Sequence, residues 1–219
     1  MPRLARLVIP GIPHHVTQRG NRRQPTFFSD DDFRLYRHLL GEGCAKAGTS
    51  IWAWCLMPNH VHLVLVPVRE DGLRAALGEA HRRYTRFVNL REDWRGHLWQ
   101  SRFASFPMDE AHLFACVRYV ELNPVRAGLV ERPAHWPWSS ARAHLGLGGG
   151  DRLTALQPMR ERVDDWQALL DAGLAAEERD RIRASERTGR PLGDAAFLGR
   201  LSEALGRPVV VRPRGRPRK

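Results

Sequence analysis

The sequence predicts an α+β fold in which an antiparallel sheet carries helices on one face. The expected elements follow one another as strand, helix, strand pair, helix, strand and helix, an order that favours an antiparallel sheet over a doubly wound parallel one. Residues 51–57 and 60–68 are rich in β-branched and apolar side chains and are separated only by Pro58-Asn59. They are therefore predicted to form a hairpin.

The first half of this core begins with a strand over residues 14–19 and a polar turn. A helix follows after Ser29, whose hydroxyl can cap it, with Asp32 three residues further on as in a capping box. This helix is expected to end near Gly48, where the hairpin takes over.

The second half adds a helix over residues 72–89 and a strand over residues 98–108. Asp109 is expected to cap a third helix. That helix should end near Asn123, because the residue before a proline disfavours the helical conformation.

A change in composition predicts two domains. The glycine-rich segment 145–150 is typical of a hinge and separates residues 1–145 from residues 146–219. The second part is expected to be a helical, arginine-rich extension, with helices around residues 160–174 and 193–205.

The end of the chain is predicted to contact DNA. Residues 207–219 carry six basic side chains and no acidic one. Within them Arg214-Gly215-Arg216 resembles an AT-hook, in which arginines enter a narrow minor groove. A flexible basic tail that binds any DNA non-specifically is the alternative.

The charge of the whole chain indicates a polyanionic partner. There are 35 basic residues against 24 acidic ones, a net charge of +11. Nearly all of the basic residues are arginine, which pairs bidentately with phosphates. A basic protein that is merely soluble is the alternative.

The cellular compartment can also be predicted. The three cysteines, Cys44, Cys55 and Cys116, show no CxxC spacing, which favours a reducing compartment and excludes a cysteine zinc site. No apolar run approaches the ~20 residues of a membrane span, and no signal-peptide core is found. We therefore expect a cytoplasmic, nucleoid-associated protein without membrane contacts.

The segment Asn59-His60-Val61-His62 opens an apolar strand. Because side chains alternate along a strand, His60 and His62 project from the same face and could ligate one divalent ion. An H-x-H pattern alone is weak, since histidine pairs are common in cores and on surfaces.

The three tyrosines differ in their helical positions. Tyr36 and Tyr84 lie on the apolar stripes of their helices, which favours packing roles. Tyr119 lies away from the apolar stripe of its helix, one turn before Asn123. Tyr119 is therefore the candidate for chemistry.

Tyr119 needs assistance to act as a nucleophile, because the unperturbed pKa of its phenol is about 10. A metal or a base must favour the oxyanion, and a metal on the scissile phosphate would also stabilise developing charge. His60, His62 and Asn123 could together hold such an ion, which we expect to be Mg²⁺ or Mn²⁺.

Two further segments are candidate DNA contacts. The turn after the first strand is dense in phosphate-binding groups: Arg19, Asn21, Arg22 and Arg23. Trp99 and Arg102 combine aromatic and basic side chains, as single-strand binders do. The alternative is that Trp99 belongs to the core and the arginines are merely solvated.

At this point the chain shows a family resemblance. It contains, in order, the strings HHVTQRGNRRQ, WCLMPNHVHLV, HLWQSRF and YVELNPVRAGLV. With these strings it resembles the REP-associated tyrosine transposases, which belong to the single-tyrosine HUH endonucleases. The resemblance covers about residues 8–145, and GRPLG, LGRPV and GRPRK resemble that family's C-terminal region.

The resemblance implies a ferredoxin-like core that acts on single-stranded DNA with a divalent metal, on palindromes that form hairpins. By position, His60 and His62 are then metal ligands, Tyr119 is the nucleophile and Asn123 is a third polar ligand. His14 departs from the pattern, because relatives often carry an aromatic residue there; the difference bears on strand packing rather than chemistry.

We therefore predict a metal-dependent single-stranded DNA endonuclease and strand transferase, that is, a transposase. Tyr119 would attack phosphorus and form a 5′-phosphotyrosine, with no small-molecule cofactor beyond the metal, in a monomer or homodimer. A non-catalytic, sequence-specific regulator that binds DNA hairpins is the alternative from another class. A structural metal protein is a third.

Overall fold

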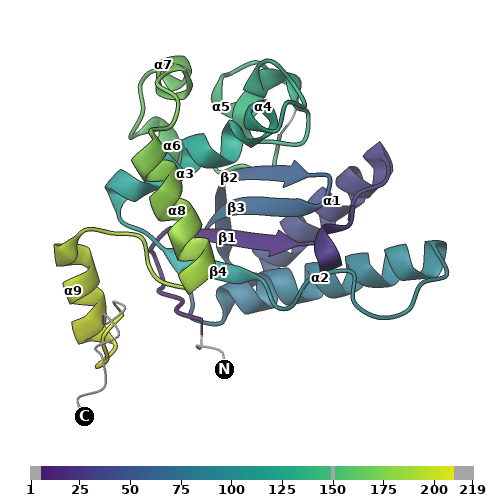
Figure 1. The fold of residues 1–219 in the computed structure, drawn as a ribbon, viewed down its shortest axis with the longest axis horizontal. Helices are drawn as coiled ribbons and strands as arrows, with labels where there is room; N and C mark the ends of the chain where they lie inside the picture. The colour runs from purple at the N-terminus through teal and green to yellow at the C-terminus, as the bar shows by residue number, and fades with distance from the viewer. Residues whose placement is uncertain (1–5, 149–150, 210–219) are drawn as a thin grey trace, which may run out of the picture.

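A computed structural model describes residues 6–148 and 151–209 and shows a four-stranded antiparallel sheet flanked by helices (Figure 1). The spatial order of the strands is β2-β3-β1-β4, which with the chain order gives a ferredoxin-like arrangement. The α+β class and the antiparallel hairpin are thus confirmed. The strands are β1 (His14–Arg19), β2 (Thr49–Met57), β3 (His60–Pro67) and β4 (Ala104–Pro107).

The fourth strand is shorter than the sequence predicts. Of the expected strand over residues 98–108, only Ala104–Pro107 is paired as a strand. Ser101 takes a left-handed φ of 65°, which interrupts an extended chain. Before it, only an isolated bridge joins Trp99 to Gly20.

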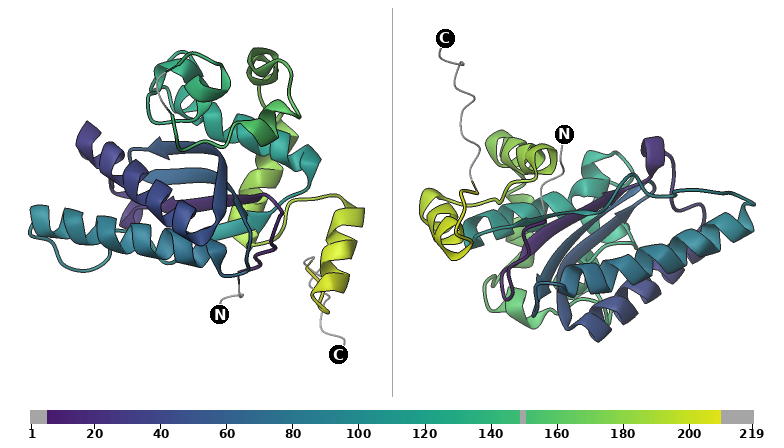
Figure 2. Two further views of the ribbon diagram at one scale, coloured as in Figure 1. Left: turned by 180° about the vertical axis from the view of Figure 1, so that it is seen from behind. Right: turned by 90° about the horizontal axis from the view of Figure 1, so that it is seen from below.

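Two long helices cover one face of the sheet. α1 (Asp30–Ala47) begins as predicted, because the Ser29 hydroxyl accepts a hydrogen bond from the Asp32 amide. α2 (Gly72–Arg91) lies beside α1, and Figure 2 shows both helices on the same side of the strands. Their apolar stripes and the strands form one core cluster, with Leu63 buried in it.

The second face of the sheet is covered by α3 (Glu110–Glu121) and α8 (Ala176–Thr188). Asp109 caps α3 as predicted, since its carboxylate accepts a hydrogen bond from the His112 amide at 2.9 Å. The expectation of helices on one face therefore holds for α1 and α2 only. The second face needs its own cover because it carries apolar side chains. These are Trp52, Ala53, Cys55, Val64 and Val66.

The longest helix that the sequence analysis does not predict is α8, and the remaining helices are shorter. Its sequence, AEERDRIRASERT, has few apolar residues, so it offers little apolar surface from which a packed helix can be predicted. The expected helix over 160–174 is split in two, whereas the one over 193–205 is found. Among helices of the described residues, none has the length and apolar content needed to cross a bilayer. The short helices are η1 (Asn21–Arg23), α4 (Asn123–Arg126), η2 (Pro133–His135), α5 (Ala141–His144), α6 (Gln157–Arg160), α7 (Trp166–Asp171) and α9 (Ala195–Ala204).

A buried carboxylate joins α3 to the C-terminal part of the chain. Glu121, the last residue of α3, is fully buried. It accepts hydrogen bonds from the Ser140 hydroxyl at 2.5 Å and the Trp166 indole at 2.9 Å, and it meets His144 Nδ1 at 2.6 Å. A buried charge is stable only when it is satisfied in this way. The contacts hold α5 and α7 against the end of α3.

Candidate active site

The two histidines of the H-x-H strand lie at the start of β3 and face α3 and α8. In the hairpin register His60 stands opposite Met57 and His62 opposite Cys55. Met57 and Cys55 belong to the core cluster beneath α3. The ring centroids of the two histidines are 4.9 Å apart. Their projection from one face, as strand alternation predicts, is confirmed.

The ring orientation of His60 is fixed by its neighbour. Its Nδ1 lies 2.6 Å from the side-chain oxygen of Asn59, whose amide nitrogen donates to the carbonyl of Arg23 at 2.9 Å. Because that amide oxygen can only accept, His60 Nδ1 carries the proton. The lone pair is then on Nε2, the tautomer that a metal ligand requires.

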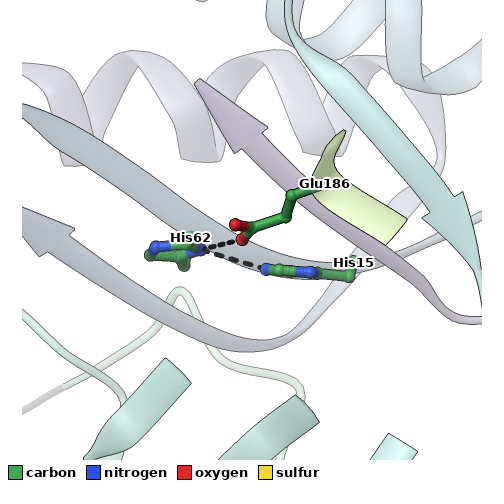
Figure 3. Close-up of side chains that lie close together, drawn as sticks. All are labelled: His15, His62 and Glu186. Carbon is green, nitrogen blue, oxygen red and sulfur yellow. Dashed lines mark hydrogen bonds and ion pairs between the residues drawn. The ribbon is translucent and has the colours of Figure 1, made fainter. Parts of the chain in front are cut away.

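His62 has a different partner. Its Nδ1 lies 3.0 Å from Nε2 of His15 and 3.8 Å from a carboxylate oxygen of Glu186. Figure 3 shows the two rings and the carboxylate turned toward one another, with His15 on β1 and Glu186 on α8. One nitrogen or oxygen from each of the three residues lies within 4.8 Å of the other two, a spacing that suits a metal ion.

This cluster contains polar atoms without partners. Nδ1 of His15 and one carboxylate oxygen of Glu186 are buried and make no hydrogen bond to the described residues. Such atoms are rare in a folded interior, where an unpaired polar group costs about 1–3 kcal/mol. Their presence fits a site that is completed by a bound group.

Burial keeps the histidines neutral. It lowers the pKa of His15 to about 3 and that of His60 to about 4, where the Arg19 charge adds to the effect. Burial, together with the neighbouring imidazoles, also lowers the pKa of His62 well below its usual range. Neutral imidazoles retain the lone pair that metal binding needs.

Tyr119 of α3 lies against this cluster. Its ring centroid is 5.4 Å from that of His62 and 6.0 Å from that of His15, and both rings meet it edge to face. The guanidinium carbon of Arg126 lies 4.4 Å from the ring centre of Tyr119. The helix that carries Tyr119 therefore meets the H-x-H strand, which sequence alone could not establish. Tyr119 is only 6% exposed and packs in one cluster with Leu113 and Val117, so the expectation that it lies away from the apolar stripe of its helix is wrong.

The phenol of Tyr119 is in a mixed electrostatic environment. Burial raises its pKa and the charge of Glu186 raises it further, whereas Arg126 and Arg183 lower it. The phenol is thus protonated at neutral pH, and the guanidinium groups of Arg126 and Arg183 can stabilise its oxyanion. Asn123 is buried at the start of α4, a separate short helix that follows the end of α3 at Glu121, and it does not line the cavity beside the histidines.

A cavity of about 310 Å³ opens beside the histidines. It extends to basic residues at the end of β1 and in the segment that precedes β4. Arg19 and Arg102, two of the predicted DNA contacts, line it together with His60, His62 and Glu186. Asn21, Arg22 and Arg23 form η1 next to it, and both arginines are exposed.

Trp99 lies elsewhere. Only 7% of its surface is exposed, and its ring packs against Phe27, Tyr36 and Tyr84 in the core beneath α1 and α2. This is the packing alternative considered for it above. The predicted contacts Arg214 and Arg216 lie outside the described residues.

Sequence reasoning missed His15 and Glu186. A signal for His15 existed, because a strand pairing with β3 brings it to the face of His62; in the register it stands opposite Val64. Glu186 gave no signal, since α8 is composed almost entirely of polar residues and a single glutamate does not stand out among them. Its position depends on how α8 packs against α3.

Comparisons with known proteins agree on one family. Residues 10–123 match the family described as "Transposase IS200 like". A REP-associated tyrosine transposase of Escherichia coli (strain K12) is 23% identical over 117 residues, which cover 53% of this chain and 68% of that protein. A Haemophilus influenzae protein (strain ATCC 51907 / DSM 11121 / KW20 / Rd), provisionally given the same name, is 30% identical over 121 residues, 50% of this chain and 69% of that protein. The solved structure of a REP-associated tyrosine transposase bound to a REP hairpin has the same fold, with a TM-score of 0.58 at 23% identity, over 71% of this chain and 93% of that chain.

Proposed function

We propose, from the premise that this chain belongs to the IS200-like transposase family, that it cleaves and rejoins single-stranded DNA through a 5′-phosphotyrosine. A role in DNA transposition follows from the family itself. The tyrosine nucleophile, the metal ligands and the hairpin or palindromic substrate are the finer parts of the proposal.

The observation that carries the proposal is the approach of Tyr119 to His62. Their ring centroids are 5.4 Å apart, although one residue comes from α3 and the other from β3. A tyrosine next to paired neutral histidines has the parts of a metal-assisted nucleophile. The core tyrosines Tyr36 and Tyr84 have no such neighbours on β3.

The donor set fits a divalent metal, which we infer to be Mg²⁺ or Mn²⁺. His60 would bind through Nε2, since Asn59 occupies its Nδ1. His62 would also bind through Nε2, and His15 and Glu186, which face its Nδ1, would then orient the ring and not bind the same ion. Asn123 would supply an oxygen one turn after Tyr119. When bound, the metal polarises the scissile phosphate and neutralises charge on it.

The chain's own residues then perform the transfer. The Tyr119 oxygen forms a bond to phosphorus while the bond from phosphorus to the 3′-oxygen breaks, and the proton lost by the phenol balances the one gained by the 3′-hydroxyl. Arg126 and Arg183 stabilise the phenolate as it forms. Attack by another 3′-hydroxyl reverses the step and joins strands without ATP, because the phosphotyrosine conserves the bond energy.

DNA contacts would surround this centre. Arg19 and Arg102 at the cavity, and Asn21, Arg22 and Arg23 on η1, are proposed to bind the phosphates. Each phosphate neutralised on a single strand steepens the dependence of log K on log salt by about 0.7.

The basic tail, with Arg214 and Arg216, would add phosphate contacts but no chemistry. Deletion of residues 210–219, which spares the packing of Val209 against α9, should therefore weaken DNA binding and flatten its salt dependence. The measurement is DNA affinity as a function of salt concentration for the full and the shortened chain. An unchanged slope would show that the tail makes no phosphate contact.

A covalent-adduct experiment tests the chemistry. The protein is incubated with a single-stranded hairpin oligonucleotide and Mn²⁺, and denaturing electrophoresis should reveal a protein–DNA adduct. Tyr119→Phe should abolish the adduct and retain DNA binding, whereas the matched variant Tyr84→Phe should still form it. An adduct that persists in Tyr119→Phe would refute the assignment. Binding without any adduct in the wild type would favour the non-catalytic hairpin-binding regulator.

A further inference from the structure

One end of the molecule carries an aromatic surface that the active site does not explain. Among the described residues, three aromatic side chains are classed as exposed: Phe28, Phe87 and Trp94, with exposed fractions of 43%, 41% and 45%. They lie together, at the start of α1 and the C-terminal end of α2, and we refer to them as the aromatic platform. Leu90, next to Arg91 at the same end of α2, is 73% exposed. Clustered exposed aromatics are unusual on a protein surface and mark an interaction site.

The aromatic platform is held in place by the fold. Phe28 and Trp94 meet edge to face, with ring centroids 5.7 Å apart. The guanidinium carbon of Arg91 lies 5.5 Å from the ring centre of Phe28 and 5.3 Å from that of Phe87. Arg91 in turn pairs with the fully buried Asp32, which also accepts a hydrogen bond from the Phe28 amide at 2.8 Å. A ligand would meet rings that are already ordered, so little entropy is lost on binding.

The aromatic platform is linked to the active site through one loop. The β1–α1 loop runs from Arg19, at the cavity, to Phe28. Its middle is bonded to the turn that precedes His60: the Thr26 amide donates to Pro58 at 2.8 Å, and Asn59 donates to the carbonyl of Arg23 at 2.9 Å. Figure 1 shows that this loop and the end of α2 lie at the same end of the sheet. A strand of DNA that leaves the cavity would reach the platform along this loop.

The surroundings of the platform carry charges of both signs: Asp30 and Asp31, which follow Phe28, pair with Arg34, and Asp93 precedes Trp94, whereas the loop that leads to the platform is basic. Arg22 and Arg23 are exposed and form no ion pair with the described residues. Both adopt a left-handed φ, 54° and 63°, as does Asp93 at 51° beside Trp94. Such conformations cost about 1 kcal/mol or more each and concentrate at functional sites.

These properties distinguish among possible occupants. Exposed aromatic rings close to arginines are typical of single-strand binding, where bases stack on rings and phosphates pair with cations. A duplex keeps its bases stacked on one another, so it cannot use the rings in this way. A second copy of the chain would cover the rings in the absence of DNA, so a dependence on protein concentration distinguishes it from DNA.

We propose that the aromatic platform binds unpaired bases of the DNA strand next to the cleavage site, with Phe28 and Trp94 as the stacking surfaces. This inference rests on the proposed function, because it assumes a single-stranded DNA substrate. In this proposal Trp94, and not Trp99, stacks on the bases. The DNA strand would run along the loop from Arg19 to Phe28.

Fluorescence gives a direct test, because Trp94 is the exposed tryptophan while the other six are buried or half-buried. Titration with short oligothymidylate should quench the emission of the wild type, and Trp94→Phe should remove most of that quenching. Blunt duplex of the same length should quench much less. Quenching that depends on protein concentration in the absence of DNA would instead show a second copy on the platform and overturn the proposal.

Affinity and salt dependence separate stacking from charge. Trp94→Ala and Phe28→Ala should each weaken oligothymidylate binding by about five- to a hundredfold without changing the salt slope. Arg23→Gln should flatten the slope by about 0.7. Val68→Ala is the matched control, since Val68 is an exposed apolar residue immediately after β3, at the end of that strand remote from His60.

The outcomes for platform and chemistry are distinguishable. Wild-type affinity and quenching in both aromatic variants, with a normal Tyr119 adduct, would refute the aromatic platform alone. Loss of affinity in both variants, in a protein that forms no adduct with any DNA, would support the platform and refute the proposed chemistry.

Discussion

The two faces of the sheet each hold a tyrosine against a histidine, but the two pairs are built differently. Beneath α1 and α2, the hydroxyl of Tyr36 lies 2.9 Å from Nε2 of His81, so each group satisfies the other. On the face covered by α3 and α8, Tyr119 meets the ring of His62 edge to face, and the hydrogen bond of His62 goes to His15.

The difference lies in what each pair leaves unsatisfied. Next to Tyr119, buried atoms of His15 and Glu186 have no partner among the described residues, and two arginines oppose the rise in the pKa of the phenol. Next to Tyr36, burial raises the pKa of the phenol and the Cys44 thiol adds to the rise. Beside Tyr36 and His81 the indole nitrogen of Trp99 is also unsatisfied, but an indole N–H cannot ligate a metal. A tyrosine beside a histidine is therefore not in itself a site; unsatisfied imidazole and carboxylate atoms mark one.

Metal binding is the property in which the two faces of the sheet should differ most. His60→Ala and His62→Ala should each lose detectable Mn²⁺ binding by calorimetry, because the remaining ligands hold a labile ion poorly. His81→Gln, on the other face, should bind Mn²⁺ like the wild type. Equal Mn²⁺ affinity in the three variants would place the metal elsewhere.

Acid should act on both faces alike. The folded-state pKa of His15 and that of His81 are each lowered to about 3 from 6.5 by burial. Below pH 6.5 the unfolded chain takes up protons that the folded chain excludes. The free energy of unfolding is thus unaffected by these two histidines above pH 6.5. As the pH decreases from 6.5 toward 3, each histidine lowers it by about 1.4 kcal/mol per pH unit.

Urea unfolding between pH 7 and pH 4 measures this loss. Saturating Mn²⁺ should raise the stability at pH 7 in the wild type and in His81→Gln, but not in His62→Ala. A free energy of unfolding that is constant down to pH 4 would contradict the burial of neutral histidines.

His15 and Glu186, the two residues next to His62 Nδ1, should also affect metal binding. His15→Ala and Glu186→Gln should weaken Mn²⁺ binding by about 10–100-fold, as is usual for residues that orient a ligand. Glu178→Gln is the control, because it lies on the same helix but pairs with Arg118 at 2.7 Å. If Glu178→Gln weakened Mn²⁺ binding as much as Glu186→Gln did, the effect would be due to the helix and not to the carboxylate of Glu186.

The smallest effect concerns the tyrosine hydroxyls. Tyr36→Phe leaves Nε2 of His81 without its partner and should lower the free energy of unfolding by about 1–2 kcal/mol. Tyr119→Phe should change it by less than about 0.5 kcal/mol, because its ring packing is retained. Thermal or urea unfolding of the two variants measures the difference, and the reverse order would show that Tyr119 is the structural tyrosine.

The elements of the core could be predicted because their signals are local. Caps such as Ser29 and Asp109, the Pro58-Asn59 turn and the alternation of His60 and His62 act within a few residues of the chain. The expectation that Tyr119 lies away from the packed face of its helix is wrong, because Tyr119 is buried in the same core cluster as Leu113 and Val117. The error in the length of β4 is also local in origin. Ser101 ends the expected strand through a single left-handed φ, and the residue type serine does not predict that conformation.

Only the tertiary structure brought His15 and Glu186 to His62, buried Trp99 and exposed Trp94. None of these follows from periodicity, because each depends on which distant segments share a face of the sheet. His15 reaches the site through the pairing of β1 with β3, and Glu186 through the packing of a helix whose own sequence is almost entirely polar. The sequence by itself determined the chemistry available to this protein, because residue types and local geometry depend only on neighbouring residues. Packing decided which of those residues meet, because burial is a property of the whole fold.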